Sequence, residues 1–322
     1  MALAIGARTP EHGTCPEWFT RAIGASRERH FVDVAGCSIH YLRWGDAKRP
    51  GLVFIPAGGG HAYWFAHVAP LLADQFHVVA LDPAGCGDSG RRHVYTQKSM
   101  IADIMAVCAD SGMFAAAVPP TLVGHSAGAQ FAVRAAMAHP DALLGVISID
   151  GLRYAKLAKD PAIKILEGPR ASPRPSRIYP TLEAAVARFH LTPAPLIPIA
   201  NSHVVDYIAA HSFRPVEGGW TSKHDPAQGC IIELALELRD VLKDLKCPAA
   251  AIYAEHTHLA DETVADKMTA LNDGVVPVFV IPGTSHYPHI DSPFAFVAAI
   301  KAIVLTWIST GRYSPMFHSK KL

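Results

Sequence analysis

The chain has 322 residues, of which 50% are hydrophobic and only 18% are charged, so it can bury a sizeable core. Basic residues number 29 and acidic residues 28, with no basic stripe, so neither nucleic acid nor a membrane is expected as a partner. The sequence has no run of about 18 uncharged apolar residues, and its N-terminus is a poor signal peptide, so we expect a cytoplasmic protein. Its six scattered cysteines form no C-x-x-C pair, so we expect them to be reduced thiols.

Short apolar strands alternate with helical stretches through most of the chain. In chain order, strands are expected at 29–34, 38–43, 52–55, 78–81, 121–123, 143–149, 249–254 and 275–281. Helices are expected at 67–74, 96–111, 129–138, 260–272 and 293–308. This alternation predicts an α/β fold in which a mostly parallel sheet is covered by helices on both faces.

The strand–helix alternation stops at Asp150 and resumes near residue 247. Between these points, helical patterns at 181–189 and 231–245 flank a cluster of proline and arginine at 168–175, which predicts an irregular loop. We therefore expect a core formed by 28–150 and 247–310, with a mostly helical lid (cap) at 151–246 inserted into it. The remaining segments are an N-terminal arm (1–27) and a polar C-terminal tail (311–322).

The motif Gly124-His-Ser-Ala-Gly128 lies between a predicted strand and a predicted helix. A G-x-S-x-G in that context predicts a nucleophile elbow, a turn too sharp for any side chain at the two glycine positions. Ser126 would then be held with its hydroxyl exposed above the helix N-terminus. Because a free serine hydroxyl is a weak nucleophile, this reading requires a base nearby.

The base is expected to be His286, which follows the last strand and precedes the final helix. A neutral imidazole there can accept the serine proton and return it to the leaving group. The competitors are His289, close by in the chain, and His125, whose position beside the nucleophile directs its side chain elsewhere.

A carboxylate must orient the imidazole, and the residues alone leave three candidates. Asp150 ends the strand that follows the elbow helix, whereas Glu255 and Asp261 follow the next strand. Because neighbouring strands are only about 4.8 Å apart, either strand end could reach the histidine loop.

Backbone amides should stabilise the oxyanion of the reaction. One is expected from Ala127, at the start of the elbow helix, and the other from Gly58 in the glycine-rich loop after strand 52–55. That loop lacks the lysine and hydroxyl of a phosphate-binding loop, and no helix opens at the glycines of 85–90 to make a dinucleotide site. The histidine pairs 256/258 and 286/289 lack obvious further ligands, so no metal and no cofactor are expected.

At this point the chain resembles the α/β-hydrolase fold superfamily over about residues 28–310. The likeness rests on four features: Pro56-Ala-Gly58 with Trp64, Asp82-x-x-Gly-x-Gly-x-Ser89, the elbow at Ser126, and His286 followed by Asp291-x-Pro293. It implies a mostly parallel eight-stranded sheet with helices on both faces and an inserted helical lid. Two features depart from the usual family pattern: Pro56-Ala57 stands where His-Gly is common, and Thr257 stands where many members carry the acid.

The family order of nucleophile, acid and histidine fits Ser126, Asp150 and His286. Haloalkane dehalogenases and a fungal zearalenone lactonase resemble this chain in carrying the acid after the earlier strand, which favours Asp150 over Glu255 and Asp261. Members that cleave alkyl halides or epoxides use an aspartate nucleophile, so a serine implies acyl transfer.

The resemblance therefore implies a carboxylesterase or lactonase. The alternatives are hydrolysis of a C–C bond in a diketone-like substrate and a non-hydrolytic ligand receptor. Aromatic residues near the expected site predict a hydrophobic small-molecule ester or lactone, and the sequence leaves a homodimer open. The candidate substrate contacts are Tyr63, Trp64, His125 and Trp220.

Overall fold

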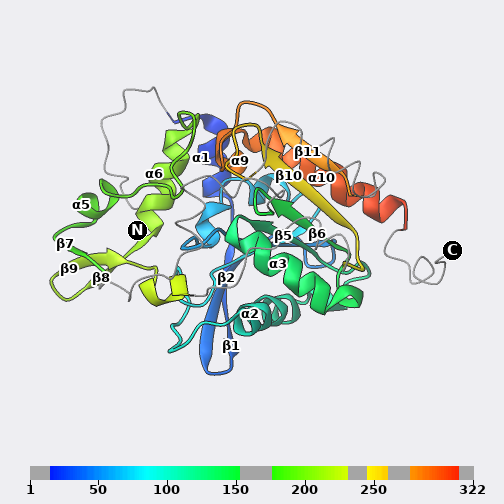
Figure 1. Ribbon diagram of the computed structural model, residues 1–322, viewed down its shortest axis with the longest axis horizontal. Helices are drawn as coiled ribbons and strands as arrows, with labels where there is room; N and C mark the ends of the chain where they lie inside the picture. The colour runs from blue at the N-terminus through cyan, green and yellow to red at the C-terminus, as the bar shows by residue number, and fades with distance from the viewer. Residues whose placement is uncertain (1–14, 153–175, 231–244, 260–275, 312–322) are drawn as a thin grey trace.

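The computed structural model describes residues 15–152, 176–230, 245–259 and 276–311 (Figure 1). Its main feature is an eight-stranded sheet in the order β1-β2-β4-β3-β5-β6-β10-β11. β1 pairs with β2, and β2 with β4, in antiparallel orientation, and every other pair is parallel. The prediction of a mostly parallel eight-stranded sheet is confirmed. The strands are β1 (Glu28–Val34), β2 (Cys37–Trp44), β3 (Gly51–Ile55), β4 (His77–Leu81), β5 (Thr121–His125), β6 (Gly145–Ile149), β10 (Ala249–Ala254) and β11 (Val278–Ile281).

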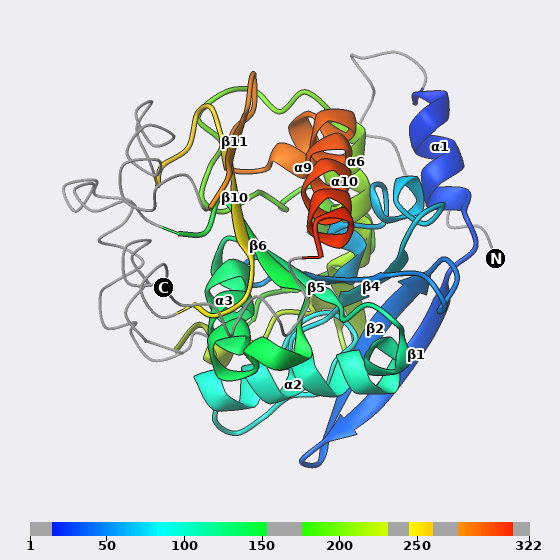
Figure 2. The ribbon, with the colours of Figure 1, turned by 90° about the vertical axis from the view of Figure 1, so that its right-hand side faces the viewer.

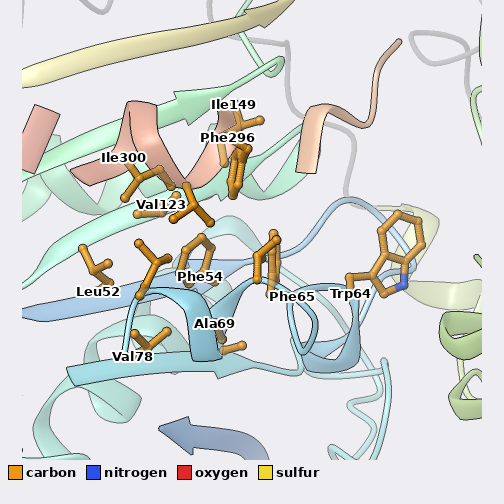
Figure 3. Close-up of a cluster of buried hydrophobic side chains, with 14 of the residues drawn as sticks. Leu52, Phe54, Trp64, Phe65, Ala69, Val78, Val123, Ile149, Phe296 and Ile300 are labelled. Atoms are coloured by element: carbon orange, nitrogen blue, oxygen red, sulfur yellow. The ribbon is translucent and has the colours of Figure 1, made fainter. Parts of the chain in front are cut away.

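Helices cover both faces of this sheet, as expected. α2 (Gln97–Asp110) and α3 (Ala127–Ala138) lie on one side, and α1 (Glu17–Gly24) and α10 (Pro293–Ser309) on the other (Figure 2). The central strands are buried at every position, because successive side chains point into opposite apolar clusters. Figure 3 shows the cluster beneath α10, where Phe296 meets the sheet residues Phe54 and Val123.

Local sequence signals explain some of the helix boundaries. Thr96 begins α2 with a capping box, in which its side chain accepts from the Ser99 amide and the Ser99 hydroxyl accepts from its amide. In place of the expected helix at 67–74, the structure has hydrogen-bonded turns on either side of a short 3₁₀ helix, Ala69–Leu71. Pro70 has no N–H to donate, and the chain must already turn into β4 at His77, so a full α-helix cannot develop there.

The inserted region differs from the mostly helical expectation. Its described part holds α5 (Leu182–Val186) and α6 (Ser202–His211), but also a three-stranded antiparallel sheet in the order β7-β9-β8. These strands are short: β7 (Ile178–Tyr179), β8 (Phe213–Val216) and β9 (Gly219–Ser222). In place of the longer helix expected at 181–189, the structure has only α5, which is five residues long. The irregular loop expected at 168–175 and the helices expected at 231–245 and 260–272 lie outside the described residues, apart from residue 245.

Polar contacts attach the described part of the inserted region to the main sheet domain. The Tyr95 hydroxyl donates to the carboxylate of Asp225 at 2.8 Å, and the Gln228 amide donates to the Ala84 carbonyl at 2.7 Å. The Tyr287 hydroxyl donates to the carbonyl of Pro193 at 2.6 Å. Residues 176–230 are thus joined to the loops at the carboxyl ends of the parallel strands. Within the described ranges, no helix is both long and apolar enough to cross a bilayer.

Candidate active site

The candidate catalytic residues follow four parallel strands at their carboxyl ends; β3, β5 and β6 are adjacent in the sheet, and β10 separates β6 from β11. β3 leads into the loop that begins at Pro56, β5 into Ser126, β6 into Asp150, and β11 into the loop that holds His286. In an open parallel sheet these ends meet along one edge, which is where functional groups gather. Strands distant in sequence therefore deliver their side chains to one place.

Ser126 lies in the sharp turn expected of a nucleophile elbow. Its backbone φ is 52°, in the left-handed region that is rare for residues other than glycine. A Cβ added at Gly124 would lie 2.5 Å from the Cα of Ala129, and one at Gly128 would overlap the carbonyl oxygen of Pro56. The turn can therefore form only with glycine at both flanking positions, and it leaves Ser126 partly exposed.

A continuous pair of hydrogen bonds joins the three expected catalytic residues. The Oγ of Ser126 lies 2.9 Å from Nε2 of His286, and Nδ1 of His286 lies 2.6 Å from Oδ2 of Asp150. Because a carboxylate can only accept, the Nδ1 atom carries the proton and Nε2 presents its lone pair to the serine hydroxyl. This is the tautomer that a general base requires.

The sheet itself sets the spacing between the nucleophile and the acid. The Ser126 amide donates to the Ile149 carbonyl at 2.9 Å, and the Asp150 amide donates to the Ile252 carbonyl at 2.8 Å. The parallel hydrogen-bond pattern thus continues one residue beyond β5 and β6. Asp150 has a φ of 42°, and its Oδ1 accepts from the Ala254 amide at 3.3 Å, so its carboxylate is held in one orientation.

The loop that carries His286 is held at consecutive residues. Asp291 accepts from both the amide and the hydroxyl of Ser285, at 2.8 and 2.7 Å. Nε2 of His125 lies 2.7 Å from the carbonyl oxygen of His286, and the Tyr287 hydroxyl makes the Pro193 contact described above. The role of Asp291 in holding this loop was not expected from the sequence, where its one signal was the Asp291-x-Pro293 spacing of the family pattern.

The two competing histidines are both completely buried. Burial lowers the pKa of His125 to about 3 and holds the pKa of His289 well below its ordinary value. His125 is in addition bonded to a backbone carbonyl, and no described side chain or backbone group hydrogen-bonds to either ring nitrogen of His289. Of the three histidines, only His286 hydrogen-bonds to Ser126.

Of the two alternative acids, only Glu255 lies among the described residues, and it bonds to a neighbouring loop instead of to His286. The Glu255 side chain is half exposed and accepts from the Gly283 amide at 2.8 Å. Asp261 lies outside the described residues. The arrangement therefore brings Asp150 to the imidazole, and Glu255 to the neighbouring loop backbone.

The two residues whose backbone amides are expected to bind an oxyanion lie close together. Ala127 is the first residue of α3, where helix amides have no intrahelical partner, and a Cβ placed on Gly58 would lie 3.6 Å from its Cβ. Gly58 is exposed and Ala127 is partly exposed. These two residues are therefore adjacent and accessible, and their role as an oxyanion hole stays a prediction.

The expected substrate contacts are dispersed. Trp64 is buried in the main apolar cluster, 6% exposed, and Tyr63 stacks on His211 with ring centroids 3.9 Å apart. Trp220 is half buried on β9, where it pairs with Tyr179 and Pro215. A substrate role for these residues and for His125 remains a prediction.

Among the described residues, His40, Asp82 and Asp88 form the one group close enough to share a metal ion. Their polar atoms already have protein partners. His40 Nδ1 bonds to Asp82 at 2.7 Å, and Asp82 also accepts from the amide of Asp88 at 2.7 Å. Asp88 in turn pairs with Arg29 at 2.8 Å and with Lys223 at 2.6 Å. This donor set fits a satisfied polar network between β2 and the loop that follows β4 rather than a metal centre.

The model of the alpha/beta hydrolase family matches residues 52–300, more than half of the chain. The chain therefore belongs to the alpha/beta hydrolase family. A 2-(acetamidomethylene)succinate hydrolase from Mesorhizobium japonicum is 29% identical to it over 279 residues, which are 84% of this chain and 92% of that protein. An N-formylmaleamate deformylase from Pseudomonas putida is 34% identical over 121 residues, 37% of this chain and 43% of that protein.

Solved structures show the same fold. The crystal structure of an E-2-(acetamidomethylene)succinate hydrolase matches with a TM-score of 0.71 at 23% identity, covering 87% of this chain and 99% of that one. A thioesterase domain from the curacin biosynthetic pathway matches with a TM-score of 0.68 at 21% identity, covering 87% of this chain and 100% of that one. These similar proteins are hydrolases of several kinds.

Proposed function

We propose that this chain is a serine hydrolase that cleaves a carboxylic ester or lactone of a hydrophobic small molecule through an acyl-enzyme. The observation that carries the proposal is the unbroken hydrogen-bond path from Asp150 through His286 to Ser126. The order of these residues and the distances of 2.6 and 2.9 Å between them support acyl transfer by a serine nucleophile.

In the first half of the reaction, Nε2 of His286 takes the Ser126 proton while Oγ attacks the substrate carbonyl carbon. The imidazolium that forms is stabilised by the Asp150 carboxylate at Nδ1. The negative charge on the carbonyl oxygen is bound by the amides of Gly58 and Ala127. His286 then gives its proton to the leaving alkoxide, the C–O bond breaks, and an alcohol departs.

In the second half, water replaces the alcohol. His286 removes a proton from the water as it attacks the acyl carbon, and the same two amides bind the second oxyanion. Collapse of this intermediate returns the proton to Oγ of Ser126 and releases the carboxylic acid. In a lactone the alcohol and the acid belong to one molecule, so ring opening gives a hydroxy acid.

A second candidate bond is an amide. The first relative described above is named for a substrate with an acetamido group, and its similarity spans most of both chains. The same sequence of steps cleaves a C–N bond, provided that His286 protonates the departing nitrogen. Amide substrates therefore belong beside esters and lactones in any substrate panel.

The test measures product release from p-nitrophenyl esters of increasing chain length, from lactones and from N-acetyl compounds. Wild-type protein should give a burst of p-nitrophenol followed by slower turnover, and S126A should give neither. The matched control is S309A, because Ser309 is an exposed serine at the end of α10. Normal turnover by S126A would overturn the proposal.

The two alternatives give different results in the same experiment. A C–C hydrolase would cleave a vinylogous diketone in preference to every ester. A receptor would show no turnover but would be stabilised by its ligand, with a rise in melting temperature in proportion to affinity. Either result would replace the ester and lactone assignment.

A further inference from the structure

The loop between β11 and α9 (Pro288–Asp291) must hold the catalytic imidazole without help from regular secondary structure. His286 lies five residues beyond Ile281, the last residue of β11, and the next helix begins only at Pro288. Its ring must nevertheless remain at hydrogen-bond distance from two partners on two other strands. A shift of the backbone at His286 would therefore move Nε2 away from Ser126.

His125 makes a contact that opposes such a shift. It is the last residue of β5, paired with Ile149 of β6, so its backbone belongs to the rigid centre of the sheet. Its Nε2–H donates to the carbonyl oxygen of His286 at 2.7 Å. Residues 125 and 126 thus contact the same residue at two points, one on its backbone and one on its side chain.

The ring of His125 has no other polar contact with the described protein. It is fully buried, no described group bonds to its Nδ1, and its ring centroid lies 5.0 Å from that of His286. Because the acceptor is a carbonyl, Nε2 must carry the proton, and this single bond fixes the tautomer. A buried histidine that makes one directed bond, to the backbone of the base, is placed to fix that backbone.

We propose that His125 is a positioning residue that sets the distance between His286 and Ser126 through the His286 carbonyl. The proposal rests on the function proposed above, since it assigns a task to His125 within that reaction. It also gives His125 a role other than the substrate contact expected from its position next to the nucleophile.

His67 provides a matched control within the same protein. Its Nε2 also donates to a backbone carbonyl, that of His289 in α9, at the same distance of 2.7 Å, and it is also fully buried. It differs in that the residue it holds has no contact with Ser126 among the described residues. Loss of either bond should reduce stability, but only loss of the His125 bond should affect the reaction.

The experiment measures the rate at which a fluorophosphonate labels Ser126, a readout that requires no knowledge of the natural substrate. H125F keeps the ring but removes the donor, and it should label about 10- to 100-fold more slowly than wild type. H125Q, whose amide nitrogen reaches about as far as Nε2, should recover most of the rate, and the shorter H125N should not. H67F should label at the wild-type rate even where its melting temperature is lower.

Turnover of p-nitrophenyl acetate provides a second readout. H125F should lower kcat and leave KM unchanged, because misplacement of the base affects the transition state and not substrate binding. If H125F fails to fold, the comparison of H125Q with H125N decides the question. Equal labelling rates for wild type and H125F, or for H125Q and H125N, would overturn the role of His125. Absence of labelling in the wild type would instead overturn the proposed function, and the role of His125 with it.

Discussion

Replacement of Asp150 by asparagine should abolish most of the activity while leaving the fold intact. Asp150 uses one carboxylate oxygen to accept from the Ala254 amide and the other to accept from Nδ1 of His286. Asparagine has only one oxygen. If that oxygen keeps the bond to Ala254, the NH₂ group faces His286, and Nδ1 must become an acceptor.

This change forces the proton of His286 onto Nε2, where it points at Ser126. The imidazole can then no longer accept the serine proton, and no carboxylate remains to stabilise an imidazolium. From the corresponding loss in other enzymes with this triad, we expect kcat to fall by about 10³- to 10⁴-fold. That corresponds to about 4 to 5.5 kcal/mol of transition-state stabilisation, at 1.36 kcal/mol for each factor of ten.

The assay is the steady-state rate with p-nitrophenyl acetate, together with a thermal melt to verify folding. E255Q is the matched control, because its amide oxygen can still accept from the Gly283 amide. D261N tests the remaining candidate from the sequence. A D150N variant within tenfold of wild type, with E255Q or D261N inactive, would refute the assignment of the acid.

The remaining predictions concern stability and metal dependence. G128A should be destabilised by about 1–3 kcal/mol or fail to fold, because its Cβ would overlap a backbone carbonyl. The control G24A, which has open space around the added Cβ, should leave stability unchanged. Chemical denaturation measures both variants. The free energy of unfolding should fall as the pH drops below about 6.5. Burial lowers the pKa of His61 and His125 to about 3 and that of His67 to about 4. Below pH 6.5 the unfolded chain therefore binds protons at these histidines that the folded chain does not bind. Each of these histidines changes the free energy of unfolding by up to about 1.4 kcal/mol per pH unit. H67F should therefore weaken the dependence of unfolding free energy on pH, as measured by urea titration. An unchanged dependence would contradict this reasoning. Dialysis against a chelator should leave the esterase rate unchanged, because no step of the proposed reaction uses a metal; recovery of a lost rate by added Zn²⁺ would count against it.

The core elements could be predicted from the sequence because their signals are local. Each central strand is a short apolar run between turn residues, and Thr96 and Ser99 mark the start of α2 by hydrogen bonds within one turn. The elbow could also be predicted. Gly124 is required by contacts with the backbone only a few residues away, and Gly128 by contacts with the backbone at the end of the neighbouring strand β3.

The small sheet of the inserted region could not be predicted in this way. β7 is two residues long and pairs with β9 more than forty residues later, with Ile178 opposite Thr221. A strand of two residues has no alternation to detect, and β8 contains Pro215, which argues against a strand in a single sequence. Pairing over such a separation is decided by tertiary contacts.

The residues of the candidate site also differ in whether a local sequence signal marks them. Ser126 and His286 carry local signals, whereas the choice among the three acids depended on which strand end reaches the histidine. The residues alone left the three acids open, and only the resemblance to family members that carry the acid after the earlier strand favoured Asp150. The bond from His125 to His286 had no sequence signal, because its two ends lie 161 residues apart.

The contacts between the inserted region and the histidine loop limit how the enzyme could be re-engineered. Tyr287, next to the base, donates to Pro193, and Asn201 donates to the carbonyl of Ile290 at 2.7 Å. A donor segment transplanted from another hydrolase to change selectivity would have to reproduce these acceptors and donors. In a chimera without these hydrogen bonds, the loop that carries His286 would be less firmly held. Its kcat should therefore fall, whether or not the new segment accepts a new substrate.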